Sequence, residues 1–177
     1  MAARLVKRGL PPVVPANARV LLLGSFPGEE SLRQAQYYAH PRNQFWRLLG
    51  DVLSVPLADL PYAKRLQRLG KLHIGVWDII TDCERAGSLD GDIRNASLSQ
   101  FAWLREHAPG LSIVALNGKK AGTAAPRIAA LGYATLVLPS SSPAYTLAYA
   151  DKLTAWNALR PLLAGLCVPA ENTSCAD

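Results

Sequence analysis

Three short polar clusters in the sequence carry side chains that could do chemistry. The segment GSFPG, residues 24–28, holds a serine hydroxyl, and YYAHPRN, residues 37–43, combines tyrosines with a histidine and an asparagine. Gly24 and Gly28 let the backbone approach a ligand closely and present N–H groups to it. The third cluster, PSSSPAY at residues 139–145, is a proline-bracketed loop of hydroxyl groups suited to holding a phosphodiester. Each cluster by itself is also typical of an ordinary turn.

The spacing of polar residues argues against several common kinds of site. GSFPG has neither the GxxxxGK[ST] spacing of a nucleoside-triphosphate loop nor the GxGxxG of a dinucleotide fold. Cys83, Cys167 and Cys175 are widely separated and lack CxxC spacing, so we expect neither a disulfide framework nor a metal cage. Free thiols of this kind indicate a reducing, cytoplasmic environment. We therefore expect chemistry without a metal or other cofactor.

Short apolar runs precede the polar clusters and must position them. Runs of Val, Ile and Leu that end at Gly, Asp, Asn or Pro are typical of buried parallel strands, and they occur at residues 20–24, 74–78, 112–117 and 135–139. Apolar residues at helical spacing cover residues 44–53, 62–69, 97–107, 119–131 and 147–163. This order predicts an α/β fold, a three-layer α/β/α sandwich around a central parallel sheet of about four strands. Because ligands of such sheets bind beyond the carboxyl ends of the strands, the loops there should share one site.

The length and composition fit one domain. The chain has 177 residues, half of them apolar, which is enough for one substantial core. We expect a partly ordered leader at residues 1–17, a single domain at 18–165 and a flexible tail at 166–177, with residues 84–96 forming a polar loop. We find no signal-peptide pattern and no apolar run long enough to span a membrane. The sequence predicts a monomer without membrane association.

The charge balance permits an anionic partner. The formal net charge is +6, and the sequence pI is near 9.5. Basic residues gather within residues 64–71 and at Lys119 and Lys120. Either group could contact phosphates or could form a solvated basic face.

The clusters, taken in order, resemble the uracil-DNA glycosylase superfamily over residues 18–160. The order is GSFPG, AHPRNQFW, a strand ending in GVWDII, a strand ending in ALNGKK, and LPSSSPAY. AHPRNQFW after a Gly-x-x-Pro-Gly loop is similar to the mismatch-specific uracil and thymine glycosylases. The Gly-Ser-Phe-Pro form, GVWDII and the acidic loop GSLDGDIRN resemble the hypoxanthine-DNA (deoxyinosine) glycosylases more closely.

This resemblance implies a monofunctional DNA glycosylase that acts on DNA containing deaminated bases. Such an enzyme hydrolyses the N-glycosidic bond of a flipped base and leaves an abasic site. Hypoxanthine is the expected substrate, and uracil is the alternative. The alternative of another class is a nucleic-acid-binding module that kept the fold and lost the chemistry.

The resemblance also assigns roles to individual residues. The residues expected to bind the base are Gly24, Ser25, Phe26, Tyr38 and His40. Tyr38 is expected to form the stacking wall, although a buried core tyrosine is also possible and Tyr37 is a substitute. His40 is either a ligand of the base or a phosphate, or a structural histidine. The residues expected to contact DNA are Ser140, Ser141, Ser142, Tyr145 and Lys119. Tyr145 either fills the vacated base stack or is an ordinary surface tyrosine.

The sequence departs from the superfamily at two positions. Many members carry Asp or Asn at the third position of the first motif, where it positions the attacking water, and this chain has Phe26. The second motif lacks the usual histidine and has Leu138-Pro139-Ser140 in its place, which leaves backbone N–H groups and serine hydroxyls as the candidates to stabilise the departing base. Asn43 is the candidate catalytic residue, because its amide offers an acceptor and donors. The competing interpretation makes Asn43 only the N-cap of the helix that follows.

Overall fold

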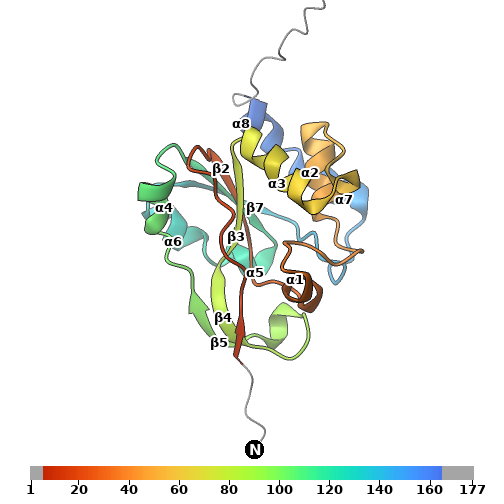
Figure 1. The fold of residues 1–177 in the computed structure, drawn as a ribbon, viewed down its shortest axis with the longest axis vertical. Coiled ribbons are helices and arrows are strands. Elements are labelled where there is room, and N and C mark those ends of the chain that lie inside the picture. The colour runs from red at the N-terminus through yellow and green to blue at the C-terminus, as the bar shows by residue number, and fades with distance from the viewer. Residues whose placement is uncertain (1–5, 165–177) are drawn as a thin grey trace, which may run out of the picture.

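A four-stranded parallel sheet forms the centre of the molecule, in the order β3-β2-β6-β7 (Figure 1). The computed structural model describes residues 6–164 of the protein. The strands of this sheet are β2 (Val20–Gly24), β3 (Ile74–Asp78), β6 (Ile113–Asn117) and β7 (Ala134–Leu138). Each lies within one residue of the run that the sequence predicted for it.

The alternation of side chains along β2 divides the interior into two cores. Leu21 and Leu23 pack into one apolar cluster, whereas Val20 and Leu22 pack into the other. Successive side chains of a strand point to opposite faces of the sheet, so a fully apolar strand must be covered on both faces. This strand therefore requires helices on each side of the sheet.

Helices cover both faces, as this pattern requires. One face carries α2 (Phe45–Leu53), α3 (Tyr62–Lys71), α7 (Tyr149–Trp156) and α8 (Leu159–Ala164). The other carries α4 (Trp103–His107), α5 (Lys119–Gly122) and α6 (Ala125–Ala130). Figure 1 shows the two groups on opposite sides of the sheet. The predicted three-layer α/β/α sandwich is confirmed.

A second, antiparallel sheet was missed by the sequence interpretation. It has the order β1-β4-β5 and consists of β1 (Val6–Arg8), β4 (Ile80–Glu84) and β5 (Arg94–Leu98). The predicted polar loop at residues 84–96 therefore begins at the end of β4 and overlaps the start of β5. It contains a short 3-10 helix, η2 (Asp90–Asp92). The helix predicted at 97–107 begins only at Trp103. All five residues of β5 are exposed, so no apolar alternation marked it as a strand.

Two predicted helices are each divided in the structure. The segment 119–131 forms α5 and α6, because Pro126 has no N–H to continue the first helix and is suited to start the second. The segment 147–163 forms α7 and α8, separated at residues 157–158. Two short helices, α1 (Glu29–Gln34) and η1 (Leu57–Asp59), were not predicted.

The leader contributes to the described structure. Val6–Arg8 pairs with β4, and Val13 exchanges backbone hydrogen bonds with Val76 of β3. The expected tail at 166–177 lies outside the described residues. Among residues 6–164, no helix is long and apolar enough to cross a membrane.

Candidate active site

A cleft of about 1430 Å³ opens at the carboxyl ends of the four parallel strands. The loops after β2, β3, β6 and β7 all contribute to it, as the topology of the sheet requires. Every predicted site residue lines this cleft: Gly24, Ser25, Phe26, Tyr38, His40, Asn43, Lys119, Ser140, Ser141, Ser142 and Tyr145. Segments more than a hundred residues apart in the chain thus meet in one place.

The GSFPG loop is held against the residues that follow β3. The N–H groups of Ile79 and Ile80 donate to the carbonyls of Gly24 and Ser25, at 2.9 and 3.1 Å. The Ser25 hydroxyl donates to Asp90 Oδ1 at 2.6 Å. Residues 84–96 therefore form a wall of the cleft, and the Ser25 hydroxyl is already engaged with this wall.

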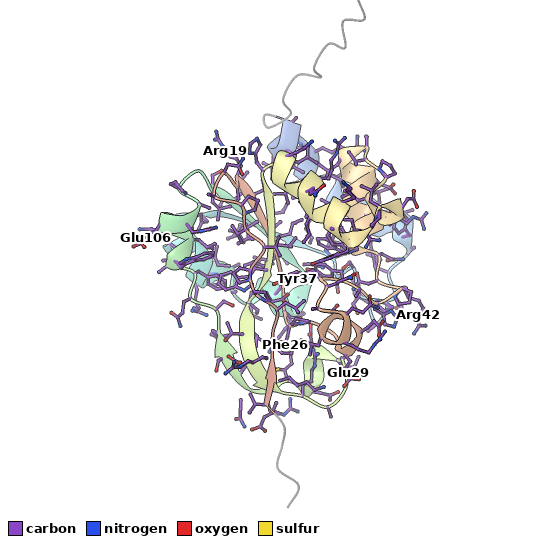
Figure 2. The ribbon with its side chains drawn as sticks, viewed as in Figure 1. Arg19, Phe26, Glu29, Tyr37, Arg42 and Glu106 are labelled. Atoms are coloured by element: carbon purple, nitrogen blue, oxygen red, sulfur yellow. The ribbon has the colours of Figure 1, made fainter. Side chains whose placement is uncertain are left out.

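Phe26 supplies an apolar surface and no polar group. Its side chain is 6% exposed and packs in a core cluster with Trp77 and Ile79. The Arg85 guanidinium lies 4.9 Å from the centre of the Phe26 ring and donates to the Pro27 carbonyl. Figure 2 shows Phe26 and Tyr37 inside the molecule and Arg42 at its edge. The polar group that the first motif lacks must come from elsewhere in the cleft.

Tyr38 stands in the cleft in a strained backbone conformation. Its φ of 55° lies in the left-handed region, which non-glycine residues rarely adopt. The ring stacks on Phe45, with 3.7 Å between ring centres and 9° between the planes. Burial and the neighbouring Asp78 raise the pKa of the Tyr38 hydroxyl, so this group stays protonated at neutral pH. A φ outlier at this position indicates that the surrounding structure fixes the ring.

Tyr37, the substitute for Tyr38, is a structural residue. It is 2% exposed, and its hydroxyl donates to the Pro11 carbonyl at 3.0 Å. Its own carbonyl accepts a hydrogen bond from the Trp46 indole at 3.1 Å. Phe45 and Trp46 are buried in the same cluster.

The Asn43 side chain bonds the backbone at the start of α2, although the N-cap position of that helix is occupied by the next residue, Gln44. Asn43 Oδ1 accepts a hydrogen bond from the Phe45 N–H at 3.0 Å. The Asn43 N–H donates to the His40 carbonyl at 2.8 Å, and His40 Nδ1 accepts from the Arg42 N–H at 3.1 Å. This tight turn fixes the Asn43 side chain at the cleft, where it is half-buried.

The serine loop after β7 is held by Asn117, the last residue of β6. Ser141 is fully buried, its N–H donates to Asn117 Oδ1 at 2.9 Å, and its hydroxyl accepts from Asn117 Nδ2 at 2.8 Å. Ser140 and Ser142 are half-buried along the cleft. The Ser141 hydroxyl therefore anchors the loop, and Ser140 and Ser142 are the hydroxyls better placed to meet a ligand.

Lys152 of α7 is a buried cation that the sequence interpretation missed. It is 1% exposed, and its Nζ donates to Gln44 Oε1 at 3.0 Å and to the Tyr145 carbonyl at 2.8 Å. Burial lowers the pKa of this ammonium group. Lys152 thus ties the loop that carries Tyr145 to the start of α2, while the Tyr145 ring is 46% exposed at the rim.

Asp78 is the most deeply buried carboxyl group of the cleft, and the sequence interpretation also missed it. It ends β3, pairs in register with Gly24 and is 4% exposed. Within residues 6–164, Asp78 Oδ2 has no hydrogen-bond partner. Burial and the Asp90 carboxylate raise the pKa of Asp78 to about 7, against the opposing effect of Arg85. GVWD at the end of a predicted strand was the available signal for this residue.

Cations surround the mouth of the cleft. Lys119 and Lys120 are exposed at one side of it, and Arg42 is exposed at another. Arg47 and Arg65 line an adjoining cavity of about 410 Å³, which also contacts Tyr38 and Asn43. This arrangement suits a flat ring held in the cleft while phosphates stay at the rim.

The fold and the cleft are compatible with a protein that binds a base on a phosphate backbone. Residues 11–162 match the family model described as the uracil DNA glycosylase superfamily. Curated relatives named hypoxanthine DNA glycosylase occur in Methanosarcina barkeri, 41% identical over 85% of this chain and 95% of the relative, and in Methanosarcina acetivorans, 40% identical over 88% and 98%. A solution NMR structure of a candidate uracil DNA glycosylase from M. acetivorans is 39% identical and superimposes with a TM-score of 0.83, over 90% of this chain and 99% of that one.

The chain belongs to the uracil DNA glycosylase superfamily. The prediction of a DNA glycosylase is therefore confirmed. The roles of the individual residues of the cleft stay predictions.

Proposed function

We propose that this protein removes hypoxanthine from DNA by hydrolysis and so initiates base excision repair, as a monomer in the cytoplasm. One observation carries the choice of substrate. The Ser25 hydroxyl donates to Asp90 Oδ1 at 2.6 Å, which joins GSFPG to the loop GSLDGDIRN in one wall of the cleft. These two segments carry the resemblance to hypoxanthine glycosylases, and the curated relatives bear that name.

The cleft suits a base that has left the helical stack. The target base enters past the cationic rim and lies against Tyr38, which replaces the stacking lost from the duplex. Ser140, Ser142 and Lys119 contact the phosphates beside the flipped nucleotide. The loss of stacking leaves a gap in the duplex, and the exposed ring of Tyr145 is the side chain that fills it.

Asn43 positions the attacking water in this mechanism. The bond from the Phe45 N–H occupies one lone pair of Oδ1, and a carbonyl oxygen has two. The second lone pair accepts from the water, so the capping and catalytic roles of Asn43 are compatible. Water oxygen bonds to C1′ while the C1′–N9 bond breaks, and N9 retains the electron pair. The proton that the water loses passes to solvent, and the released purine anion takes up a proton from solvent, so the products are an abasic sugar and neutral hypoxanthine. Backbone N–H groups of the cleft oppose the negative charge on the leaving purine.

The proposed enzyme does not cut the DNA strand. A lysine that attacks C1′ as a Schiff-base nucleophile must reach the sugar as a neutral amine, usually in a desolvated pocket. Lys119 and Lys120 are exposed to solvent at the rim, and Lys152 is held by acceptors beneath the serine loop. Hydrolysis to an abasic site is the outcome.

Excision from defined oligonucleotides tests this proposal. The protein is incubated with labelled DNA that contains one inosine or one uracil, and abasic sites are revealed by cleavage in hot alkali. Fast cleavage at inosine supports the proposal, and faster cleavage at uracil instead supports the alternative substrate. Binding to inosine DNA without any abasic product would show a binding module. Strand cleavage before the alkali step would contradict the monofunctional mechanism.

A further inference from the structure

A buried lysine packs against the serine loop, residues 139–145. The Lys152 side chain is 1% exposed, and its Nζ donates to Gln44 Oε1 at 3.0 Å. It also donates to two carbonyls of the loop, to that of Tyr145 at 2.8 Å and, more weakly, to that of Ser142 at 3.5 Å. An ammonium group has three N–H donors and no acceptor, so three surrounding acceptors match the protonated side chain. The conformation of the loop therefore depends on this cation.

The charge of Lys152 has no acidic partner in the described part of the chain. A fully buried lysine is normally paired with a carboxylate, because burial of an uncompensated charge costs free energy. Within residues 6–164, the ion pairs involve other residues, and the three groups that Nζ contacts are neutral oxygen atoms. The described residues thus leave one buried positive charge without a negative partner.

The hydroxyl groups of the same loop are set to donate into the cleft. Ser140 Oγ accepts from the Ser142 N–H, and Ser142 Oγ accepts from the Ala144 N–H, both at 3.2 Å. Each hydroxyl accepts a hydrogen bond from the backbone and keeps its own hydrogen to donate. Both serines line the cleft and are half-buried. A ligand held by these two hydroxyls must offer acceptors, as a phosphate does.

A phosphate at this position lies close to the buried cation. The Ser142 hydroxyl faces the cleft, and the Ser142 carbonyl contacts Lys152 Nζ. A phosphate bonded to that hydroxyl is separated from the ammonium group by Ser142 alone. Opposite charges attract each other more strongly through the protein than through water, because the protein screens them less.

We propose, on the basis of the proposed function, that Lys152 is a positioning residue for one DNA phosphate beside the flipped nucleotide. Its ammonium group holds the serine loop so that the Ser140 and Ser142 hydroxyls donate to this phosphate. The negative charge of the phosphate balances the positive charge that the chain leaves unpaired. Lys152 acts through the loop without touching DNA, and it orders the loop before DNA binds.

Neutral phosphate analogues test this coupling by binding alone. Duplexes carry 2′-fluoro-2′-deoxyinosine, or the deoxyuridine analogue if wild type excises uracil, and a methylphosphonate replaces each neighbouring phosphate in turn. For wild type, one such replacement should weaken binding by about tenfold or more, because hydrogen bonds to a charged group are strong. Lys152→Met should bind unmodified DNA more weakly, and most of the penalty for that methylphosphonate should disappear, since the two changes remove one interaction.

Lys64→Met is the matched control, because Lys64 is an exposed lysine of α3 that does not line the cleft. This variant should keep the full methylphosphonate penalty, whatever its overall affinity. An equal penalty in Lys152→Met and wild type would overturn the role of Lys152 even if wild type excises hypoxanthine. Because the measurement is of binding, a lack of excision would overturn the proposed function alone.

Hydrogen exchange in the free protein tests whether Lys152 orders the loop. The Tyr145 N–H donates to the Ser142 carbonyl at 3.1 Å, and the Gln44 N–H donates to the Ser141 carbonyl at 3.0 Å. Both amides should exchange faster in Lys152→Met, and unchanged exchange would contradict the ordering. The single-turnover rate with saturating enzyme should change little, because Lys152 does not touch the reacting atoms. If Lys152→Met does not fold, the neutral Lys152→Gln replaces it, with the same expected loss of the penalty.

Discussion

Replacement of Asn43 separates its catalytic role from its capping role. Asn43→Ala removes the hydrogen bond that Asn43 Oδ1 accepts from the Phe45 N–H at 3.0 Å, at the start of α2. Loss of such a cap costs about 0.5–2 kcal/mol of unfolding free energy. Loss of a group that positions a reactant typically costs about 10²–10⁴-fold in rate. The two consequences are measured independently, one by denaturant titration and the other by single-turnover excision.

Asn43→Asp is the sharper variant. Aspartate retains the acceptor for the Phe45 N–H, and its negative charge at the start of α2 is favourable, so we expect wild-type stability or better. The change removes the amide donors and places a charge beside the reacting sugar. Single-turnover excision of hypoxanthine should therefore change in Asn43→Asp without a change in folding, and it should fall about 10²-fold or more in Asn43→Ala.

Asn157 provides the matched control for these variants. It lies between α7 and α8 and does not line the cleft, and its Oδ1 accepts from Arg160 Nε at 2.9 Å. Asn157→Ala and Asn157→Asp should alter stability slightly and leave the rate of the folded enzyme unchanged. Excision rates within a few-fold of wild type in both Asn43 variants would refute the catalytic assignment and leave Asn43 as a cap.

Three further predictions concern the base, the serine loop and the DNA backbone. Tyr38→Ala should weaken binding to inosine DNA by about 1–3 kcal/mol through lost stacking, whereas Tyr38→Phe should have little effect, because it keeps the aromatic ring. Lys152→Met keeps the packing of the stem but loses the bonds to Gln44 and the Tyr145 carbonyl, so the KM for DNA should rise more than kcat falls, and an unchanged KM would contradict this. The logarithm of the binding constant should fall with the logarithm of salt concentration by about 0.9 per phosphate contacted, and Lys119→Ala should reduce that slope by about one contact.

The sequence predicted the parts of the fold that are set by strong patterns. Three of the four parallel strands, β2, β3 and β6, are buried along nearly their whole length, so their apolar runs stand out, and the edge strand β7 carries a similar run although most of its residues are exposed. The position of the cleft follows from the rule for the carboxyl ends of such strands. The second sheet was missed because its pairing depends on distant segments, and β5 exposes all its residues. Its register depends on backbone hydrogen bonds that no side-chain pattern reveals.

The missed site residues have a shared physical reason. Asp78 ends an apolar run and Lys152 lies in an amphipathic helix, which are positions where a charged side chain is usually exposed. Both are buried because segments distant in sequence cover them, Gly24 and Tyr38 in one case and the serine loop in the other. The burial of Asp78 and Lys152 therefore depends on tertiary contacts, which the local sequence pattern does not reveal.

The environment of Phe26 explains why the polar groups of the site lie elsewhere. Arg85 stacks on the Phe26 ring and is 5% exposed, and within the described residues its Nε and Nη1 have no hydrogen-bond partner. A carboxylate or amide at position 26 would face this guanidinium and would bind it, because a buried cation strongly favours such a partner. The same side chain would then be turned away from the cleft and unavailable to water. With Arg85 in place, an aromatic residue at position 26 keeps the loop packed. The polar side chains of the cleft therefore come from other elements, Asn43 from the turn before α2 and Asp78 from the end of β3.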